Sequence, residues 1–367
     1  MRNLRLEESQ ILFEIVGNFH VHTDHSDGTG THQEVARAAA QAGLDVIVFT
    51  DHNRRVAGQE GWYIHPETGK QVLLLMGEEV HAPGRSSMNH YLCLGVDQEL
   101  RQHAPRPQDL INAVNRNAGV GFIAHPIERP ASASLYHEAE IPWTDWEVNG
   151  FTGIELWNYM SEFKGFVTSS SAAVFAAFFP STQISGPLLE TLALWDSLLG
   201  NGQRVVAIGG ADAHANVYSL GPIKRSVFPY QYLFRAVNTH LLLDTPLSDD
   251  LIMAKSQVLD ALRAGQAFVA YDLAGTSRGF RFTATCQEGN ASMGDEIRTN
   301  GPVALRVRSP LPAVLRLLKD GEMIVQAWGQ ELVYEANEPG VYRVEAYHRY
   351  RLKRRGWVFT NPIYIRG

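Results

Sequence analysis

The sequence predicts an α/β protein followed by a smaller region of antiparallel strands. Short apolar runs beside histidine, aspartate or glutamate recur along most of the chain, and helix signals lie between them. This alternation of strands and helices is typical of an α/β fold with a largely parallel sheet. After Asp272 the pattern changes to short alternating strands. With 367 residues, 45% of them hydrophobic, the chain is long enough for two domains.

The first apolar segment leads into a histidine-rich motif. Alternate residues of an extended strand point to the same face, so His20 and His22 can offer two imidazoles to one ion. Asp27 follows in the same motif as a further candidate ligand. The next apolar run, residues 46–49, is typical of a strand covered on both faces, and it delivers His52 at its carboxyl end. That end of the strands holds the active site in α/β barrels.

The same combination of an apolar run and an ionisable residue recurs further along the chain. Residues 72–76 lead to Glu79, residues 120–124 lead to His125, residues 205–210 lead to Asp212 and His214, and His90 precedes residues 91–94. Burying so many ionisable groups together would be costly without a cation to neutralise them. We therefore expect a site for divalent metal ions with nine candidate ligands, which are His20, His22, Asp27, His52, Glu79, His90, His125, Asp212 and His214.

Helices are expected between these strands. Thr31 and Glu34 have the spacing of a capping box, and Gly43 is a stop signal. Together they predict a helix that begins after Thr31 and ends before Gly43. Proline or glycine signals delimit further helices, which we expect over residues 107–118, 187–199 and 248–264. Residues 126–202 form a long, irregular segment rich in aromatic residues. These aromatics form either an apolar wall or lid over the site or the core of an extra helical subdomain.

The last part of the chain is expected to consist of strands. Asp320-Gly321 is a common hairpin turn, and we expect it between strands over residues 314–319 and 323–325. We predict that residues 1–275 form the α/β domain and that residues 276–367 form a small antiparallel β-sandwich, with an immunoglobulin-like arrangement as one possibility. The basic run within residues 349–355 is expected to be a solvated hairpin, with contact to an anionic partner as the alternative.

Composition narrows the classes of function. The formal net charge of −7 argues against general nucleic-acid binding, although bound divalent ions would reverse the field locally. Residues 1–14 lack the uninterrupted apolar stretch of a signal peptide, and no apolar run reaches the ~20 residues of a bilayer helix. Cys93 and Cys286 are expected to be buried free thiols. We therefore expect a cytoplasmic protein that binds neither nucleic acid nor membrane, and its oligomeric state stays open.

The motifs in their order resemble those of a known superfamily. They are His20-x-His22-Thr23-x-x-Ser26-Asp27-Gly28, Thr50-Asp51-His52-Asn53, Gly77-x-Glu79, His90 before an apolar run, Ala124-His125-Pro126 and Asp212-Ala213-His214. This order is similar to that of the PHP (polymerase and histidinol phosphatase) superfamily, and within it to the CehA/McbA-like metallohydrolases. The resemblance implies a distorted (β/α)7 barrel with two or three divalent ions in a cleft at the carboxyl ends of its strands.

The resemblance also implies how the ligands divide among the ions. The first set would be His20, His22, Glu79 and Asp212, the second Glu79, His90 and His125, and the third Asp27, His52 and His214. Glu79 would then bridge the first two ions. Some relatives have a histidine near the position of Asp27, so the occupancy of the third position stays open. Mixed nitrogen and oxygen ligands suit manganese, iron and zinc alike. Glu155 is not included, because the matching family position is not usually a ligand.

We interpret the chain as a metal-dependent hydrolase, with a metal-bridging hydroxide that attacks a phosphate ester of a small molecule. Glu79, Asp212 and His214 are the expected catalytic residues. Hydrolysis of a carbamate, amide or ester, as the CehA/McbA resemblance suggests, is the first alternative, and a non-catalytic metal-binding interaction module is the second. Residues expected to contact the substrate are Asn53, Arg54, Arg129, Asn158 and Arg225.

Overall fold

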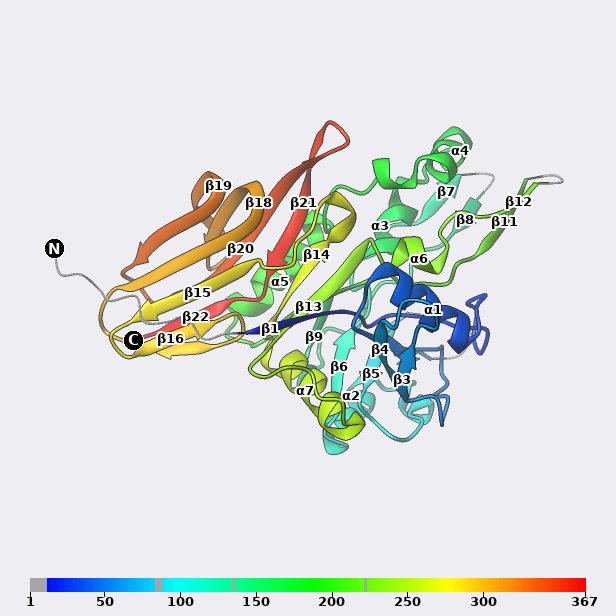
Figure 1. Cartoon of the computed structure of the whole chain (residues 1–367), viewed down its shortest axis with the longest axis horizontal. Helices are drawn as coiled ribbons and strands as arrows, with labels where there is room; N and C mark the ends of the chain where they lie inside the picture. Colours follow the sequence, from blue (N-terminus) through cyan, green and yellow to red (C-terminus); the bar gives the residue numbers. More distant parts are fainter. Residues whose placement is uncertain (1–11, 83–87, 134–135, 221–222) are drawn as a thin grey trace.

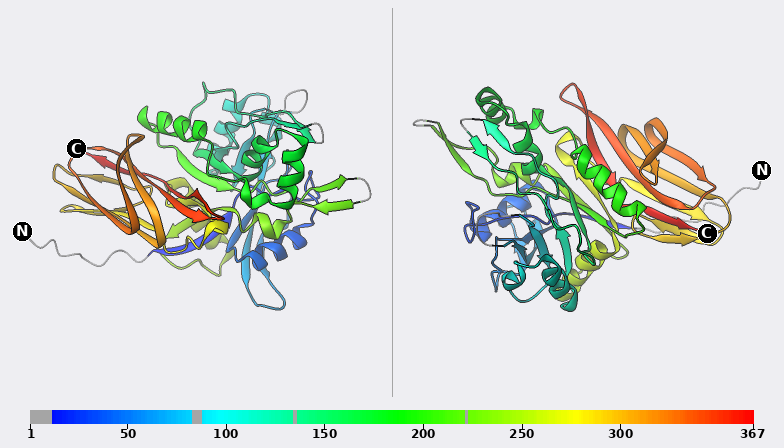
Figure 2. Two further views of the ribbon diagram at one scale, coloured as in Figure 1. Left: turned by 90° about the horizontal axis from the view of Figure 1, so that it is seen from above. Right: turned by 180° about the vertical axis from the view of Figure 1, so that it is seen from behind.

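The computed structural model describes residues 12–82, 88–133, 136–220 and 223–367. Figure 1 shows two parts, a mixed α/β part that contains strands β1 to β14 and a C-terminal β-rich part. The two further views in Figure 2 show the same parts side by side, with the C-terminus in the β-rich part. The predicted α/β class is therefore confirmed, and so is an antiparallel β-rich region after it.

Seven strands of the α/β part follow one another in a ring. They are β1 (Phe13–Asn18), β2 (Val46–Phe49), β4 (Gln71–Val80), β5 (Tyr91–Leu94), β6 (Val120–Ile123), β9 (Gly153–Asn158) and β10 (Val206–Gly210). Each pairs with the next along its backbone. Just beyond β1 and β10, Val21 and Ala213 form a parallel bridge that closes the ring. Strand β1 also pairs with β13 (Val237–Leu243). The Thr239 hydroxyl of β13 hydrogen-bonds to the backbone of Gly209 in β10, so β13 contacts both β1 and β10.

The ring is not uniformly parallel, as it would be in a regular α/β barrel. Strand β5 is antiparallel to both of its neighbours, so His90 enters the same edge from the amino end of β5. Glu79 lies inside β4 and not beyond it, because the last residues of β4 pair with β5 and prolong the strand to Val80.

The predicted helices are present within a few residues of their expected bounds. Helix α1 (His32–Ala42) has the complete capping box, since the Thr31 hydroxyl accepts from Glu34 N and the Glu34 carboxylate accepts from Thr31 N. Gly43 ends α1 with φ +89°, a left-handed conformation that favours glycine. The other predicted helices are α2 (Pro107–Arg116), α5 (Leu189–Gly200) and α7 (Leu251–Ala264).

The remaining elements of the α/β part lie between the ring strands or follow the last of them. They are β3 (Gly61–Ile64), η1 (Arg101–His103), β7 (Ala131–Ala133), β8 (Tyr136–Glu138), α3 (Tyr159–Phe166), α4 (Ser170–Phe178), η2 (Pro180–Thr182), β11 (Val217–Leu220), β12 (Ile223–Ser226), α6 (Tyr230–Leu233), β14 (Ala267–Tyr271) and η3 (Asp272–Ala274). In the aromatic-rich segment, Trp143, Trp157 and Phe163 are buried, whereas Trp146 is 36% exposed. For the three buried residues the structure favours the core alternative over the lid. Among the described residues, no helix has the length and apolarity needed to span a bilayer.

The C-terminal strands are β15 (Arg281–Cys286), β16 (Gly289–Ser292), β17 (Glu296–Arg298), β18 (Val303–Lys319), β19 (Glu322–Ala336), β20 (Gly340–Tyr350), β21 (Lys353–Thr360) and β22 (Ile363–Arg366). Their pairing is antiparallel except between β17 and β22. The predicted turn is confirmed, because Asp320 and Gly321 have φ +52° and +85° between β18 and β19. However, β18 begins well before the strand that we expected over residues 314–319, and its two halves pair with different neighbours, β15 and β20.

The two parts share backbone pairing, because β14 pairs with β21. The domain boundary at residue 275 and the immunoglobulin-like arrangement stay predictions. Both cysteines are free thiols as expected. Cys93 is buried, whereas Cys286 is only partly buried, because it lies on a strand close to the surface.

A buried ionic network also joins the two parts. His240 of β13 lies between two carboxylates, with Nδ1 2.7 Å from Glu14 Oε1 and Nε2 3.2 Å from Asp272 Oδ2. Glu14 in turn pairs with Arg281 of β15 at 2.6 Å. Burial alone would lower the pKa of His240, but Asp272 and Glu14 outweigh it and raise this pKa to about 9. The imidazolium therefore belongs to the folded protein at neutral pH.

We predict that His240→Gln destabilises the protein in a pH-dependent way. The folded-state pKa lies above the ordinary value of 6.5, so this contribution is complete below about pH 6.5 and is lost as the pH rises through about 9. In urea unfolding with a chelator present, the loss should be on the order of 3 kcal/mol at pH 6 and smaller at pH 9.5. His103→Gln, in η1, is the control. An equal loss for His240→Gln at both pH values would contradict the assignment.

Candidate metal centre

Glu79 lies at the centre of the predicted ligands. Its Oε2 atom is 3.1 Å from His20 Nε2, 3.1 Å from His22 Nε2 and 3.2 Å from His52 Nδ1. The other oxygen, Oε1, is 2.7 Å from His90 Nδ1 and 3.2 Å from His125 Nε2. A side chain near the carboxyl end of β4 thus contacts imidazoles that come from four other regions of the ring.

Asp212 completes the group on the side of β1. Its Oδ1 atom is 3.3 Å from His20 Nε2 and 3.2 Å from His22 Nε2. The backbone explains this closeness, because His22 N donates to Ala213 O and Ala213 N donates to His20 O where the ring closes. The bridge between Val21 and Ala213 therefore points His20 and His22 to one face, as the two-residue spacing predicts.

The backbone at this edge of the ring is strained. Asn53, His125 and Asp212 have φ values of +51°, +28° and +52°. A non-glycine residue in this region costs about 1–3 kcal/mol, and such residues cluster at functional sites. Here the positive φ values turn the chain sharply after strands β2, β6 and β10, so that side chains just beyond the strands turn toward the cluster.

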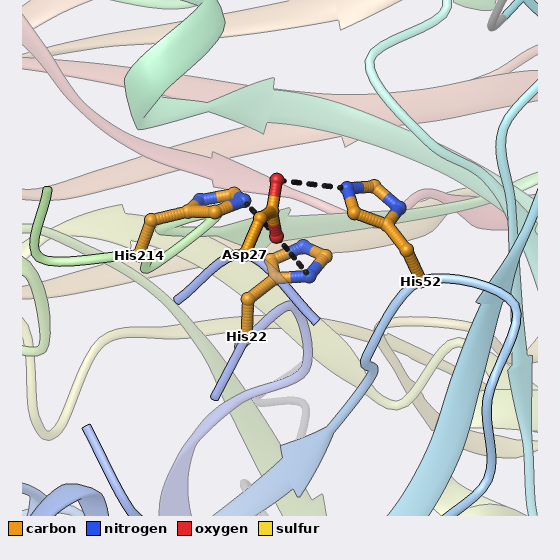
Figure 3. A group of neighbouring side chains, drawn as sticks. All are labelled: His22, Asp27, His52 and His214. Carbon is orange, nitrogen blue, oxygen red and sulfur yellow. Dashed lines mark ion pairs between the residues drawn. The ribbon is translucent and has the colours of Figure 1, made fainter. Parts of the chain in front are cut away.

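A second group surrounds Asp27, as Figure 3 shows. Asp27 Oδ1 is 3.1 Å from His214 Nε2 and 3.7 Å from His22 Nδ1, and Asp27 Oδ2 is 3.5 Å from His52 Nε2. His52 therefore faces Glu79 with one ring nitrogen and Asp27 with the other, so it lies between two of the implied ligand sets. The Asp27 side chain is 56% exposed, which makes this group the open side of the cluster.

The loop that carries Asp27 is held by residues that the sequence reasoning did not single out. The Asp51 carboxylate accepts from Thr23 N at 2.7 Å, from the Thr23 hydroxyl at 2.8 Å and from the Ser26 hydroxyl at 2.6 Å. Tyr230 of α6 donates its hydroxyl to His22 O at 2.8 Å. Asp51 was visible in the motif beside His52, whereas the contact of Tyr230 depends on tertiary structure alone.

Several buried atoms of the cluster have no hydrogen-bond partner among the described residues. Buried atoms in this state are His20 Nε2, His22 Nε2, His52 Nδ1, His90 Nε2, His125 Nδ1 and Glu79 Oε2. Each buried polar atom without a partner costs about 1–3 kcal/mol. Two ligands at about 2.1 Å from one ion lie about 3.0–3.4 Å apart, which is the spacing around Glu79 Oε2. The residues present therefore fit divalent cations.

The pKa shifts of the buried carboxylate and imidazoles agree with a site for cations. Burial raises the pKa of Glu79, but His20, His90 and His52 outweigh this effect and hold it well below its usual range. Burial lowers the pKa of His20, but Asp212, Glu155 and Glu79 raise it well above its usual range. The Glu79 carboxylate is thus ionised beside His20, whereas burial outweighs the effect of Glu79 on His90 and lowers its pKa to about 4.

All nine predicted ligands lie in this one cluster, and their role as ligands stays a prediction. The expected substrate contacts are placed less clearly. Asn53 Oδ1 accepts from His81 N, and Arg54 is exposed with a long contact to His25 O. Arg129 is paired with Glu190 at 2.5 Å. The side chain of Arg225 lies outside the described residues.

Asn158 and Glu155 differ most from expectation. Asn158 is buried, and its amide bonds to Glu155, Asp212 and Ser161, which leaves little freedom for a substrate contact. Glu155, which we did not include, is 1% exposed and lies directly behind His20. A charged residue inside the apolar run 153–157 was the sequence signal for it.

Comparison with known proteins agrees with the motifs. The model of the PHP domain family matches residues 18–167 of this chain. No curated protein matches the chain. Among solved structures, the chain is similar to a two-domain protein from Bacteroides vulgatus that contains a predicted PHP-like metal-dependent phosphoesterase. The two are 14% identical with a TM-score of 0.42, over 96% of this chain and 95% of that one.

Two further structures are similar to part of the chain. One is from Bifidobacterium adolescentis and is proposed to be a metal-dependent phosphoesterase, with 17% identity and a TM-score of 0.32 over 56% of this chain and 90% of that one. The other is an amidohydrolase from Chromobacterium violaceum with bound sulfate and no metal, with 15% identity and a TM-score of 0.30 over 58% and 92%. At these identities and TM-scores, the similarities establish no function for this chain.

We predict that Glu79→Gln lowers the amount of metal that the protein binds. The neutral amide cannot supply the negative charge that five imidazoles surround, so at least one equivalent should be lost after loading with manganese or zinc and gel filtration. Elemental analysis measures this. Glu78→Gln is the matched control, because Glu78 is also buried in β4 but accepts from Leu100 N on the opposite face. Undiminished metal content in Glu79→Gln would rule out a bridging role.

Proposed function

We propose that this protein is a metal-dependent hydrolase of phosphate esters. The single observation that carries the proposal is the convergence of five imidazoles on the buried Glu79 carboxylate, with ring nitrogens that have no hydrogen-bond partner in the part of the chain that the structure describes. The match of residues 18–167 to the PHP domain family supports it, since that superfamily includes phosphatases. The finer assignment to the CehA/McbA-like group rests on the sequence motifs.

The chain's own residues prepare the site in three ways. Divalent ions, when bound, polarise a substrate oxygen and lower the pKa of water toward neutrality. Glu79 and Asp212 supply negative charge that draws cations to the buried end of the cluster. His20, His22 and His125 exclude water there, because they are almost completely buried. Asp27 and His214 occupy the more open end, where a substrate can enter.

Neither cysteine is suited to act as a nucleophile. Burial raises the pKa of the Cys93 thiol well above its usual range, and Cys286 lies in β15 of the C-terminal part. The Ser26 hydroxyl, which lies 3.5 Å from His22 Nδ1, donates to Asp51. Activated water is therefore the nucleophile that the arrangement favours. A phosphate ester suits this chemistry, because several cations can neutralise its oxygens, and Arg54 at the surface can add a further contact.

We predict that the manganese- or zinc-loaded protein hydrolyses p-nitrophenyl phosphate or the matching diester faster than an aryl carbamate. Absorbance of released p-nitrophenol gives the rates. Turnover of the carbamate alone would replace phosphoester chemistry with the acyl alternative, and no turnover of any substrate by fully loaded protein would favour the non-catalytic module.

We also expect Asp212→Asn to reduce turnover by about 100-fold or more, because Asp212 supplies a carboxylate to the group that contains His20 and His22. The matched control is Asp260→Asn, which removes an exposed carboxylate on α7. Circular dichroism of both variants checks the fold. Wild-type activity in folded Asp212→Asn would contradict the placement of the reaction at this cluster.

A further inference from the structure

Glu155 stands behind the cluster and contacts ligands that belong to different cation positions. We propose that Glu155, together with Asn158, is the positioning residue that fixes His20, His125 and Asp212, and that the two cation positions around Glu79 fill together because of it. This inference rests on the proposed function only in that the cluster holds divalent cations. It concerns side chains that face away from the substrate.

The first contact fixes one imidazole. His20 Nδ1 lies 3.0 Å from Glu155 Oε1 and 3.1 Å from Oε2, so its N–H donates to the carboxylate. A proton held on Nδ1 leaves the Nε2 lone pair free, and Nε2 is the atom that faces Glu79 and Asp212. A carboxylate in this position fixes the tautomer and the ring orientation of a ligating histidine and increases its basicity.

The second contact fixes the backbone of another candidate ligand. Glu155 Oε2 accepts from His125 N at 3.1 Å. His125 has φ +28°, a conformation that a non-glycine residue adopts only when its surroundings hold it. The Glu155 carboxylate supplies part of that hold, and it thereby helps to direct the His125 ring toward Glu79 Oε1.

The third contact passes through Asn158. Its amide nitrogen donates to Glu155 Oε2 at 2.8 Å and to Asp212 Oδ2 at 3.3 Å. The Asn158 carbonyl oxygen cannot turn toward either carboxylate, because it accepts from Ser161 N at the start of α3. The helix cap therefore sets which end of the amide faces Glu155 and Asp212.

Packing around these contacts is tight on the side of β10. Glu155 is 1% exposed, and the neighbouring strand β10 has a glycine at the point of contact. A Cβ atom on Gly210 would lie 2.9 Å from His20 Cβ and closer still to Glu155 Oε1. Among the described residues, Glu155 has an ion pair with His20 and none with lysine or arginine. Its charge is thus directed to the cluster.

These contacts connect two sets of ligands. His20 and Asp212 lie with His22 on one side of Glu79, and His125 lies with His90 on the other. One carboxylate touches both sides, so loss of its charge and geometry should weaken both cation positions at once. Loss of the Asn158 amide alone should affect only the position beside Asp212.

The test measures metal binding without any substrate. Zinc affinity of each equivalent is determined by competition with a chelating dye, and the visible spectrum of the cobalt-loaded protein reports the coordination. For Glu155→Gln we expect both equivalents to bind about 10–100-fold more weakly, with a changed cobalt spectrum. Glu162→Gln is the matched control, because Glu162 is buried nearby but accepts from Trp157, Ser185 and Gly186. It should bind as the wild type does.

Two further variants keep the proposal testable if Glu155→Gln does not fold. Asn158→Ser keeps a residue that can cap α3 but removes the amide donor, and it should weaken one equivalent only. Gly210→Ala should weaken both, because the methyl group displaces the Glu155 carboxylate.

Unchanged affinities in folded Glu155→Gln, or in Gly210→Ala, would overturn the positioning role. Weakening of a single equivalent in either would overturn the coupling of the two positions. If the wild type binds two equivalents but hydrolyses no ester, the proposed function fails and the positioning role stands.

Discussion

The buried carboxylate of Glu79 is the constraint on which the rest of the site depends. Five imidazoles lie within hydrogen-bond distance of its two oxygens, and a carboxylate in this environment is stable only with positive charge around it. The raised pKa of His20 and the lowered pKa of Glu79 show this need, and divalent cations can supply the positive charge. Because Glu79 is inside β4, the position of the cluster is fixed by the sheet and not by a loop.

Closure of the strand ring brings the ligands to this carboxylate. The parallel bridge between Val21 and Ala213 joins the first and last strands of the ring just where His20, His22 and Asp212 leave it. The antiparallel strand β5 delivers His90 from its amino end, and the pairing of His52 with Glu79 places β2 beside β4 at the same edge. Backbone hydrogen bonds thus position the side chains. Glu155 adds hydrogen bonds to the His20 ring and to the backbone of His125.

Much of this arrangement could be predicted from local signals. The capping box of α1, the Asp320-Gly321 turn and the apolar runs of the ring strands each depend on neighbours in sequence, and the structure has all of them. The expectation that Glu79 follows its strand was wrong, because the apolar run ends before the backbone pairing with β5 does. Asn158 was expected at the substrate, but its amide is committed to Glu155 and Asp212.

The sequence by itself determined the identity of the nine candidate ligands and the elements that carry them, because hydrophobic periodicity and spacing are local properties of the chain. Only the tertiary structure decided which atoms of these ligands face one another, that His52 lies between two groups, and that Glu155 supports both sides of Glu79. Some of these contacts join residues more than a hundred positions apart, as that between His20 and Glu155 does. They depend on how strands pair, and no short segment of the chain encodes that pairing.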